Sequence, residues 1–181
     1  VTLVGVVSAD TMLHQPDLRA AERTFQLIAQ VAGRTGRSDR GGRVFVQTYC
    51  PDEPVITLAS KHDYFTFAEM ELNHRRERSA PPFASLARVI VRSPTEQQSQ
   101  QESVNLAVRF RMEIARLVLP IKVIGPAPCP IMRLRGQHRF HFQMSTASSE
   151  TYQPLWRELA NKIRLPEGVE FVIDVDPLDM R

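Results

Sequence analysis

Residues 19–49 read RAAERTFQLIAQVAGRTGRSDRGGRVFVQTY, and this stretch decides the fold of the first half of the chain. Its opening part carries apolar residues at helical spacing, at Ala21, Phe25, Ile28 and Ala32. Gly33 and Gly36 then end the predicted helix, because glycine permits backbone conformations that break it. The last part, residues 43–49, alternates as a strand does. The stretch therefore predicts a helix followed by a strand.

Working outward, residues 1–7 read VTLVGVV and are nearly all apolar and often β-branched. That pattern predicts a strand buried on both faces, as in a parallel sheet. Strand, helix and strand in this order form a βαβ unit. Residues 54–78 predict one broken or two short helices, which Pro81-Pro82 ends. We place a domain boundary there, so that residues 1–80 form an α/β domain and residues 81–181 a second domain.

The second domain is predicted to be β-α-β-β-α-β in outline, with one extra short strand. A strand over residues 84–92 precedes Ser93-Pro94-Thr95-Glu96, which fits a helix capping box. The helix ends at Pro120, a short strand covers residues 121–124, and Pro126, Pro128 and Pro130 make a stiff connection. A hairpin over residues 131–146 turns at Gly136-Gln137, a helix carries Tyr152 to Ile163, and a last strand covers residues 169–175. We expect an α+β domain with a mostly antiparallel sheet and two helices.

Positive charge is concentrated in one part of this domain, although the net charge of the chain is only +3. No acidic residue lies between Glu113 and Glu150, a window that holds Arg116, Lys122, Arg133, Arg135 and Arg139. In the hairpin, alternation should place Arg133, Arg135, Arg139 and His141 on one face, opposite the aromatic residues. Such a cationic strip suits phosphates or an acidic peptide. The alternative is a solvated sheet surface whose arginines pair with the acidic C-terminal tail.

Composition excludes other classes. No apolar run approaches the ~20 residues needed to cross a bilayer, so we expect a cytoplasmic location and no membrane partner. The two cysteines, Cys50 and Cys129, lack zinc spacing, and His14 and His62 have no partner at metal spacing. We therefore predict no metal site. No cluster of residues in the sequence supports a metal-dependent enzyme or an enzyme that acts on a small molecule.

Residues 30–37, QVAGRTGR, carry the strongest chemical pattern. Arg34 and Arg37 lie three apart on a turn that Gly33 and Gly36 make flexible. Two guanidinium groups placed this way can converge on the oxygens of a triphosphate. The segment also joins a helix to a strand, where α/β folds place ligands. The alternative is a basic helix-to-strand turn without a ligand.

This segment resembles motif VI of superfamily 2 helicases, QxxGRxGR. The stretches VTLVGVVSAD, PDLRAAERTFQLIAQVAGRTGR and GRVFVQTYCPDEPV and the closing DVDP, residues 174–177, narrow the resemblance. Together they resemble the primosomal protein N′ (PriA) family of replication-restart helicases over nearly the whole chain.

The resemblance implies that residues 1–80 are the tail of a RecA-like helicase lobe from an ATP-dependent 3′–5′ DNA helicase. Gln30, Gly33, Arg34 and Arg37 would approach ATP, which binds with Mg²⁺ in the full-length protein. Arg37 would reach the γ-phosphate as an arginine finger, with Arg34 as a second contact. The C-terminal domain would contact forked or single-stranded DNA, single-strand binding protein and primosome proteins, and we expect a monomer.

The chain also departs from the family pattern. The family's Walker A lysine, DExH box and zinc-binding cysteines lie upstream of the matching segment, so we expect this chain alone not to hydrolyse ATP. Gln137-His138 occupies a place where the family tends to have an aromatic residue, which removes an expected stacking contact. The second hypothesis for function is a stand-alone nucleic-acid or protein binding module without a motor.

Overall fold

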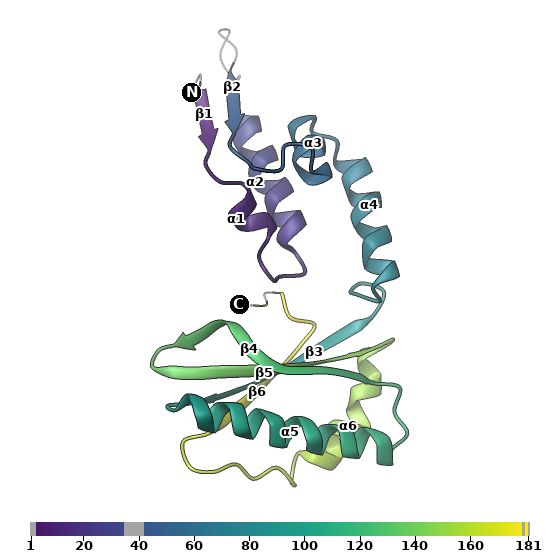
Figure 1. Cartoon of the computed structure of the whole chain (residues 1–181). Coiled ribbons are helices and arrows are strands. Elements are labelled where there is room, and N and C mark those ends of the chain that lie inside the picture. The colour runs from purple at the N-terminus through teal and green to yellow at the C-terminus, as the bar shows by residue number, and fades with distance from the viewer. Residues whose placement is uncertain (1–2, 35–41, 179, 181) are drawn as a thin grey trace. The chain divides into compact units, whose positions relative to one another are not determined.

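The computed structural model describes residues 3–34, 42–178 and 180 (Figure 1). Contacts between residues divide the chain into two compact units, one running to His74 and the other starting at Arg75. The sequence places a domain boundary slightly later, at Pro81. The two units are described separately below.

Unit 1 contains the predicted strand–helix–strand arrangement. Its elements are β1 (Leu3–Val6), α1 (Asp10–Leu13), α2 (Ala20–Arg34), β2 (Arg43–Val46), α3 (Pro54–Ser60) and α4 (Tyr64–Glu77), the last of which runs into unit 2. The strands β1 and β2 pair in parallel, from Leu3 opposite Arg43 to Val6 opposite Val46. The helix α2 connects them, as a parallel pair requires. Two short helices follow, which confirms the second of the two alternatives for residues 54–78.

The core of unit 1 lies on one side of this strand pair. Phe25 and Ile28 of α2 are buried against α3 and α4, and the ring of Phe25 stacks on Phe67 at 4.4 Å between centroids. The prediction that residues 1–7 are buried on both faces is wrong for the described residues, since Leu3 is 59% exposed and Val7 is 79% exposed. The reason is that α2 covers one face of a sheet that has only two strands here.

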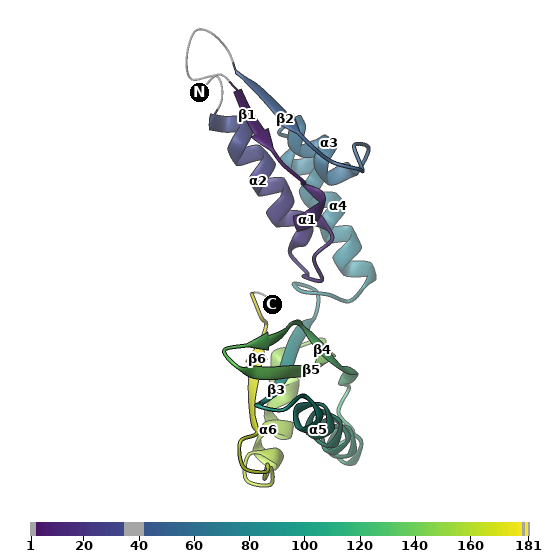
Figure 2. The ribbon, with the colours of Figure 1, turned by 60° about the vertical axis from the view of Figure 1, so that its left-hand side comes forward.

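Unit 2 is an α+β domain with an antiparallel sheet, as predicted. Its elements are β3 (Ser85–Ser93), α5 (Glu96–Arg116), β4 (Lys122–Leu134), β5 (Gln137–Thr146), the 3-10 helix η1 (Ser149–Tyr152), α6 (Gln153–Leu159) and β6 (Glu170–Val175). The strand order is β4-β5-β3-β6, and every neighbouring pair is antiparallel (Figure 2). This is the split βαβ arrangement of ferredoxin-like domains.

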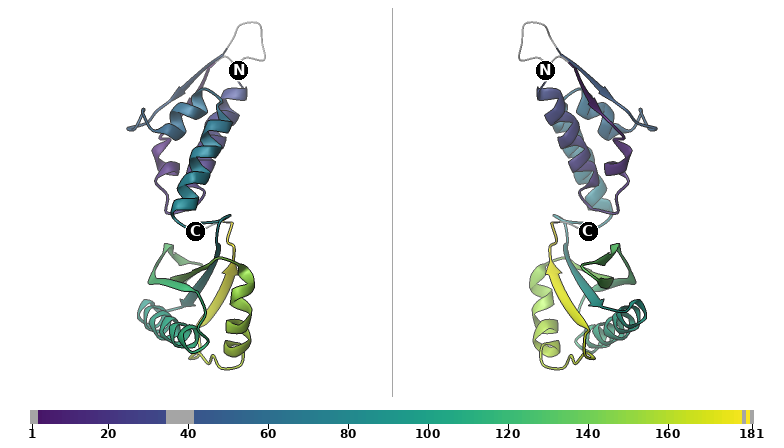
Figure 3. Two further views of the ribbon diagram at one scale, coloured as in Figure 1. Left: turned by 90° about the vertical axis from the view of Figure 1, so that its right-hand side faces the viewer. Right: turned by 90° about the vertical axis from the view of Figure 1, so that its left-hand side faces the viewer.

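Both helices of unit 2 cover the same face of the sheet (Figure 3). Phe110 of α5 meets Phe142 of β5 edge-to-face, with 5.2 Å between ring centroids, and Leu155 of α6 is fully buried beside them. Alternate residues of β3 and β5 therefore point to the opposite face, which no helix of this unit covers.

Among the described residues, no helix combines the length and hydropathy needed to span a membrane.

Two polar side chains, those of Tyr152 and Asp176, connect other segments of unit 2 to the start of β3. The Tyr152 hydroxyl lies 3.0 Å from the carbonyl oxygens of both Ser85 and Met144. The Asp176 carboxylate accepts hydrogen bonds from the Ser85 hydroxyl and the Leu86 amide, each at 2.9 Å. Asp176 belongs to the DVDP sequence, so this part of the family resemblance has a structural role: it fixes the chain after β6 to the start of β3.

The structure differs from the prediction in the region of β4. The three prolines expected to form a stiff connection, Pro126, Pro128 and Pro130, lie inside β4, whose register to β5 shifts twice. Proline is tolerated there because β4 is an edge strand. A proline on its open side, where no other strand pairs, removes no hydrogen bond of the sheet.

Two local features also differ. The hairpin turn consists of Arg135 and Gly136, one residue earlier than predicted, and both have positive φ, 50° and 82°. The residue that precedes helix α5 as its N-cap is Thr95. Ser93, expected to cap the helix, instead accepts a hydrogen bond from the Thr95 amide in the preceding loop.

Candidate functional site

The end of α2 presents the first predicted site. Gln30 and Gly33 lie on its exposed face, and nothing lies within 4 Å of the position that a Gly33 side chain would occupy. Arg34 is the last residue of the helix. Its side chain and all of Arg37 lie outside what the structure describes, so the convergence of the two guanidinium groups stays a prediction.

The tip of the β4–β5 hairpin carries the second predicted site. Arg133 and Arg135 are exposed there, and Arg133 pairs with His138 across the ladder. Met132 and Leu134, which alternate with the arginines, are also about half exposed, at 49% and 46%. The tip thus exposes both of its faces, one cationic and one apolar.

The other two residues of the predicted strip are not on the surface. Arg139 and His141 point away from α5 and α6, as the alternation predicts, but they are only 9% and 8% exposed. The expectation of one exposed cationic strip is therefore wrong for these two residues. The expected shared face is wrong as well, because Arg133 lies opposite His138 in the ladder, on the face of β5 that carries Phe140 and not Arg139. The physical reason lies in β4, which has extra residues between Pro128 and Arg133, where its register to β5 shifts. This bulged part carries Cys129, which is itself buried.

Arg139 and His141 belong to a buried basic cluster, which we define as Arg88, Cys129, Arg139 and His141. Arg88 of β3 is only 1% exposed, and its Nε donates a 2.7 Å hydrogen bond to Nδ1 of His141. Because Nδ1 accepts, the neutral imidazole carries its proton on Nε2. Arg139 donates to the Ile131 carbonyl at 3.5 Å, a long contact that ties β5 to the base of the hairpin tip.

Burial sets the protonation states in the cluster. Burial, together with the smaller effect of the positive charges of Arg88 and Arg139, lowers the pKa of His141 from 6.5 to about 4. Burial also raises the pKa of the Cys129 thiol, and the two arginines only partly oppose this. At neutral pH, His141 is therefore an uncharged acceptor and Cys129 a protonated thiol. The positive charge of the cluster resides on its arginines.

One donor of the cluster has no hydrogen-bond partner among the described residues, namely Nη2 of Arg88. A buried donor without an acceptor costs about 1–3 kcal/mol, and more when the group is charged. Sequence reasoning missed Arg88, because in SLARVIVR it looks like an ordinary outward residue of a strand. Its burial depends on β4, which follows it in the chain only after a long helix.

Comparison with known proteins places the chain in a family. The family model described as "Primosomal protein N C-terminal domain" matches residues 76–178. A relative from Bacillus subtilis named "Replication restart protein PriA" is 39% identical over 99% of this chain, and one of the same name from Treponema pallidum is 36% identical over 98%. A third, from Synechocystis, is 36% identical over 99%.

The chain spans only 21–27% of the length of these three relatives. Among solved structures, the de novo designed protein Foldit4 matches 52% of the chain at 15% identity and a TM-score of 0.36, which is too weak a likeness to bear on the fold. The family model, in contrast, covers more than half of the chain. With relatives of one name along nearly its whole length, the chain belongs to the PriA family of primosomal proteins.

Proposed function

We propose that this chain is the C-terminal part of an ATP-dependent DNA helicase that acts in primosome assembly and replication restart. The observation that carries the proposal is the 39% identity to a replication restart protein over 99% of the chain, which includes the QVAGRTGR segment. In this proposal unit 1 belongs to the second motor lobe, and unit 2 contacts DNA or single-strand binding protein.

Two features of unit 1 support a role in a larger lobe. Parallel sheets are normally covered on both faces, whereas Leu3 and Phe45 leave one face of this strand pair apolar and exposed. The exposed Gln30 and Gly33 lie on the last turns of α2, free to face a nucleotide held by another lobe. Arg34 and Arg37 then add positive charge beside the ATP phosphates. An arginine finger of this kind accelerates phosphoryl transfer by roughly 10³–10⁵.

A chimera tests the motor role. In it, this chain replaces the matching 22% of the Bacillus subtilis relative. The chimera should hydrolyse ATP in a DNA-stimulated manner, while the chain of 181 residues alone should not. If the folded chimera lacks ATPase activity but the chain still binds DNA, the alternative of a binding module without a motor is the better account.

In unit 2, Arg133 and Arg135 are the proposed DNA contacts. They are exposed at the hairpin tip, and arginine–phosphate contacts provide affinity that does not depend on sequence and that falls with salt. The exposed Met132 and Leu134 offer apolar area for bases or for a partner protein. Arg139, which is buried, does not contact DNA in this proposal. It holds the hairpin tip in place through its hydrogen bond to the Ile131 carbonyl.

Salt titration of single-stranded DNA binding by the 181-residue chain tests this surface. Each phosphate contact contributes a slope of about 0.7 in log K against log salt, so replacing Arg133 and Arg135 with alanine should reduce the slope by about 1.4. The control replaces Arg157 and Arg164, which are exposed at and after α6. Equal slopes for both double variants would exclude the hairpin tip as a DNA contact.

A further inference from the structure

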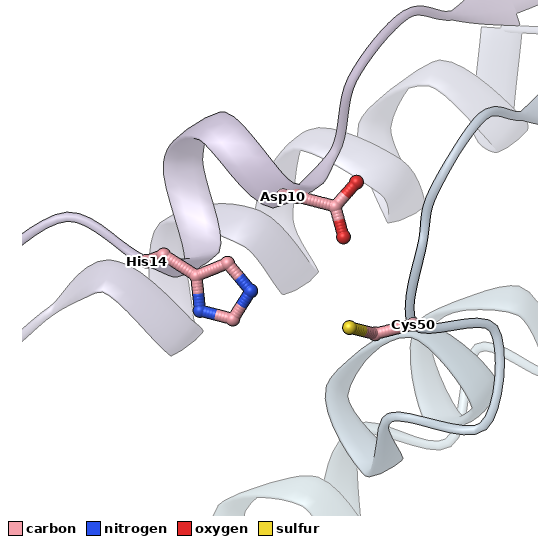
Figure 4. A group of neighbouring side chains, drawn as sticks. All are labelled: Asp10, His14 and Cys50. Atoms are coloured by element: carbon pink, nitrogen blue, oxygen red, sulfur yellow. The ribbon is translucent and has the colours of Figure 1, made fainter.

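Three side chains with metal-binding atoms meet in unit 1, outside the sites described above. Figure 4 shows the Asp10 carboxylate, the His14 imidazole and the Cys50 thiol pointing toward the same space. One ligand atom from each lies within 4.8 Å of those of the other two. The sequence predicts no metal site because Cys50 is distant in the chain from the other two residues.

The fold brings these residues together at the carboxyl ends of two parallel strands. Asp10 opens α1 just after β1, and His14 follows α1 one helical turn later, so both side chains lie on one face of that turn. Cys50 comes shortly after β2. The pairing of the strands continues past their ends, since the Ala9 amide donates to the Gln47 carbonyl at 3.0 Å. This edge is where α/β folds place their ligands.

Neighbouring groups hold the carboxylate in place. The Thr48 hydroxyl donates to Oδ1 of Asp10 at 2.8 Å, and the Tyr49 amide lies 3.2–3.3 Å from both carboxylate oxygens. The Thr48 hydroxyl in turn accepts from the Cys50 amide at 3.0 Å. One short network thus joins the Asp10 carboxylate to the backbone of Cys50, and Oδ2 of Asp10, which among the described residues accepts only from the Tyr49 amide, keeps a lone pair for a metal ion. Supporting bonds of this kind are typical of metal ligands.

The ligand set points to zinc. Carboxylate oxygen, imidazole nitrogen and thiolate sulfur are its usual protein ligands, and their bond lengths place ligand atoms about 3.3–3.8 Å apart in a tetrahedral site. The three atoms here lie within 4.8 Å of one another, so shifts of about 1 Å in the side-chain positions would bring them to the distances of a zinc site. His14 is exposed and can rotate freely, and a water molecule can supply the fourth ligand.

We propose that Asp10, His14 and Cys50 bind one Zn²⁺ ion, which links α1 to the segment after β2. The ion replaces the thiol proton of Cys50, which is released to solvent, and leaves one coordination position for water. The proposal depends neither on the motor role nor on DNA binding by unit 2.

Cobalt titration of the metal-free 181-residue chain tests the proposal, since tetrahedral Co²⁺ reports its ligands by absorption. We expect visible d–d bands and a thiolate-to-cobalt charge-transfer band at one equivalent, and their loss when Zn²⁺ is added. The charge-transfer band should vanish in Cys50→Ser and persist in Cys129→Ser, which removes the other cysteine of the chain. His14→Ala removes a proposed direct ligand. Loss of a residue that only supports a ligand weakens metal binding roughly 10–100-fold, so this variant should weaken Co²⁺ binding by at least that much. His74→Ala, an exposed histidine of α4, should not.

Folding is checked separately, because a misfolded variant would also lose the bands. Far-ultraviolet circular dichroism should be the same for Cys50→Ser and wild type without metal. Zn²⁺ should raise the unfolding temperature of wild type and Cys129→Ser but not that of Cys50→Ser. A charge-transfer band that survives in Cys50→Ser, or a wild-type chain that gives no bands at one equivalent of Co²⁺, would overturn the proposal.

Discussion

Acidification should destabilise unit 2 through His141. The imidazole accepts a hydrogen bond from Arg88, and burial together with the charges of Arg88 and Arg139 lowers its pKa from 6.5 to about 4. Between these two values the unfolded chain binds a proton that the folded chain does not. The free energy of unfolding should therefore fall as the pH drops through this window, and the contribution of His141 should be complete below about pH 4.

The size of the effect follows from the gap between the two pKa values. At 1.36 kcal/mol per pKa unit, the gap corresponds to about 3 kcal/mol. Whole domains are stable by only about 5–15 kcal/mol, so this single group controls a large fraction of the stability. Hydrogen bonds from Arg116 and Lys162 respectively hold the pKa values of Glu113 and Glu158 below their usual range, so their contribution to stability is also lost as the pH falls, equally in wild type and in a His141 variant.

The assay is urea unfolding of the chain at a series of pH values from about 7.5 to about 4. The single tryptophan, Trp156, packs against the core of unit 2 and reports its unfolding. His141→Asn keeps an acceptor for Arg88 but cannot titrate, so its stability should vary with pH by about 3 kcal/mol less than that of wild type. His138→Asn, a partly exposed histidine, is the control. Equal pH dependence in His141→Asn and wild type, or a titration of His141 near 6.5 by NMR, would refute the reasoning.

Three substitutions in unit 2 give further predictions, each measured by urea unfolding with tryptophan fluorescence. Tyr152→Phe removes the hydroxyl that bonds the carbonyls of Ser85 and Met144, and should cost about 1–3 kcal/mol because those buried acceptors lose their partner; no change would mean that water replaces it. Phe142→Ala should cost about 3–5 kcal/mol, since the side chain is fully buried, and a cost below about 1 kcal/mol would contradict the described packing. Asp176→Ala should cost about 1–3 kcal/mol, whereas Asp174→Ala, on an exposed position of β6, should be nearly neutral.

Local patterns were sufficient to predict most of the elements of unit 2. The alternation at Phe140, Phe142 and Met144 identified the face of β5 that packs on the helices. The stripe of Tyr152, Leu155 and Leu159 likewise identified the buried face of α6, preceded by a short 3-10 turn. These predictions succeeded because side chains of one element share a face at a fixed period, whatever lies elsewhere in the chain.

Where distant parts of the chain determine the environment, the sequence was not sufficient. Alternation placed Arg139 and His141 on the correct face, but it could not show that the bulged β4 makes that face buried. Leu3 and Phe45 look like core residues, and they are exposed because, in the part of the chain that the structure describes, only two strands form this sheet. The meeting of Cys50 with residues of α1 depends on parallel strand pairing. No spacing within a single segment encodes it.

The resemblance contributed what local patterns could not, because it named a family that the comparisons confirm. It also identified DVDP as a shared sequence without explaining it. The hydrogen bonds of Asp176 to the start of β3 supply a physical reason for an aspartate at that position. The roles of Arg34 and Arg37 rest on the motif alone and stay predictions.

The most direct test of the account is the rate of ATP hydrolysis by the chimera with Arg37→Ala, measured in single turnover with saturating DNA. The account predicts that the rate falls by about 10³–10⁵ while ATP still binds and the fold is retained, whereas Arg43→Ala, an exposed arginine at the start of β2, leaves the rate unchanged. An Arg37→Ala chimera that hydrolyses ATP as fast as its parent would contradict the account.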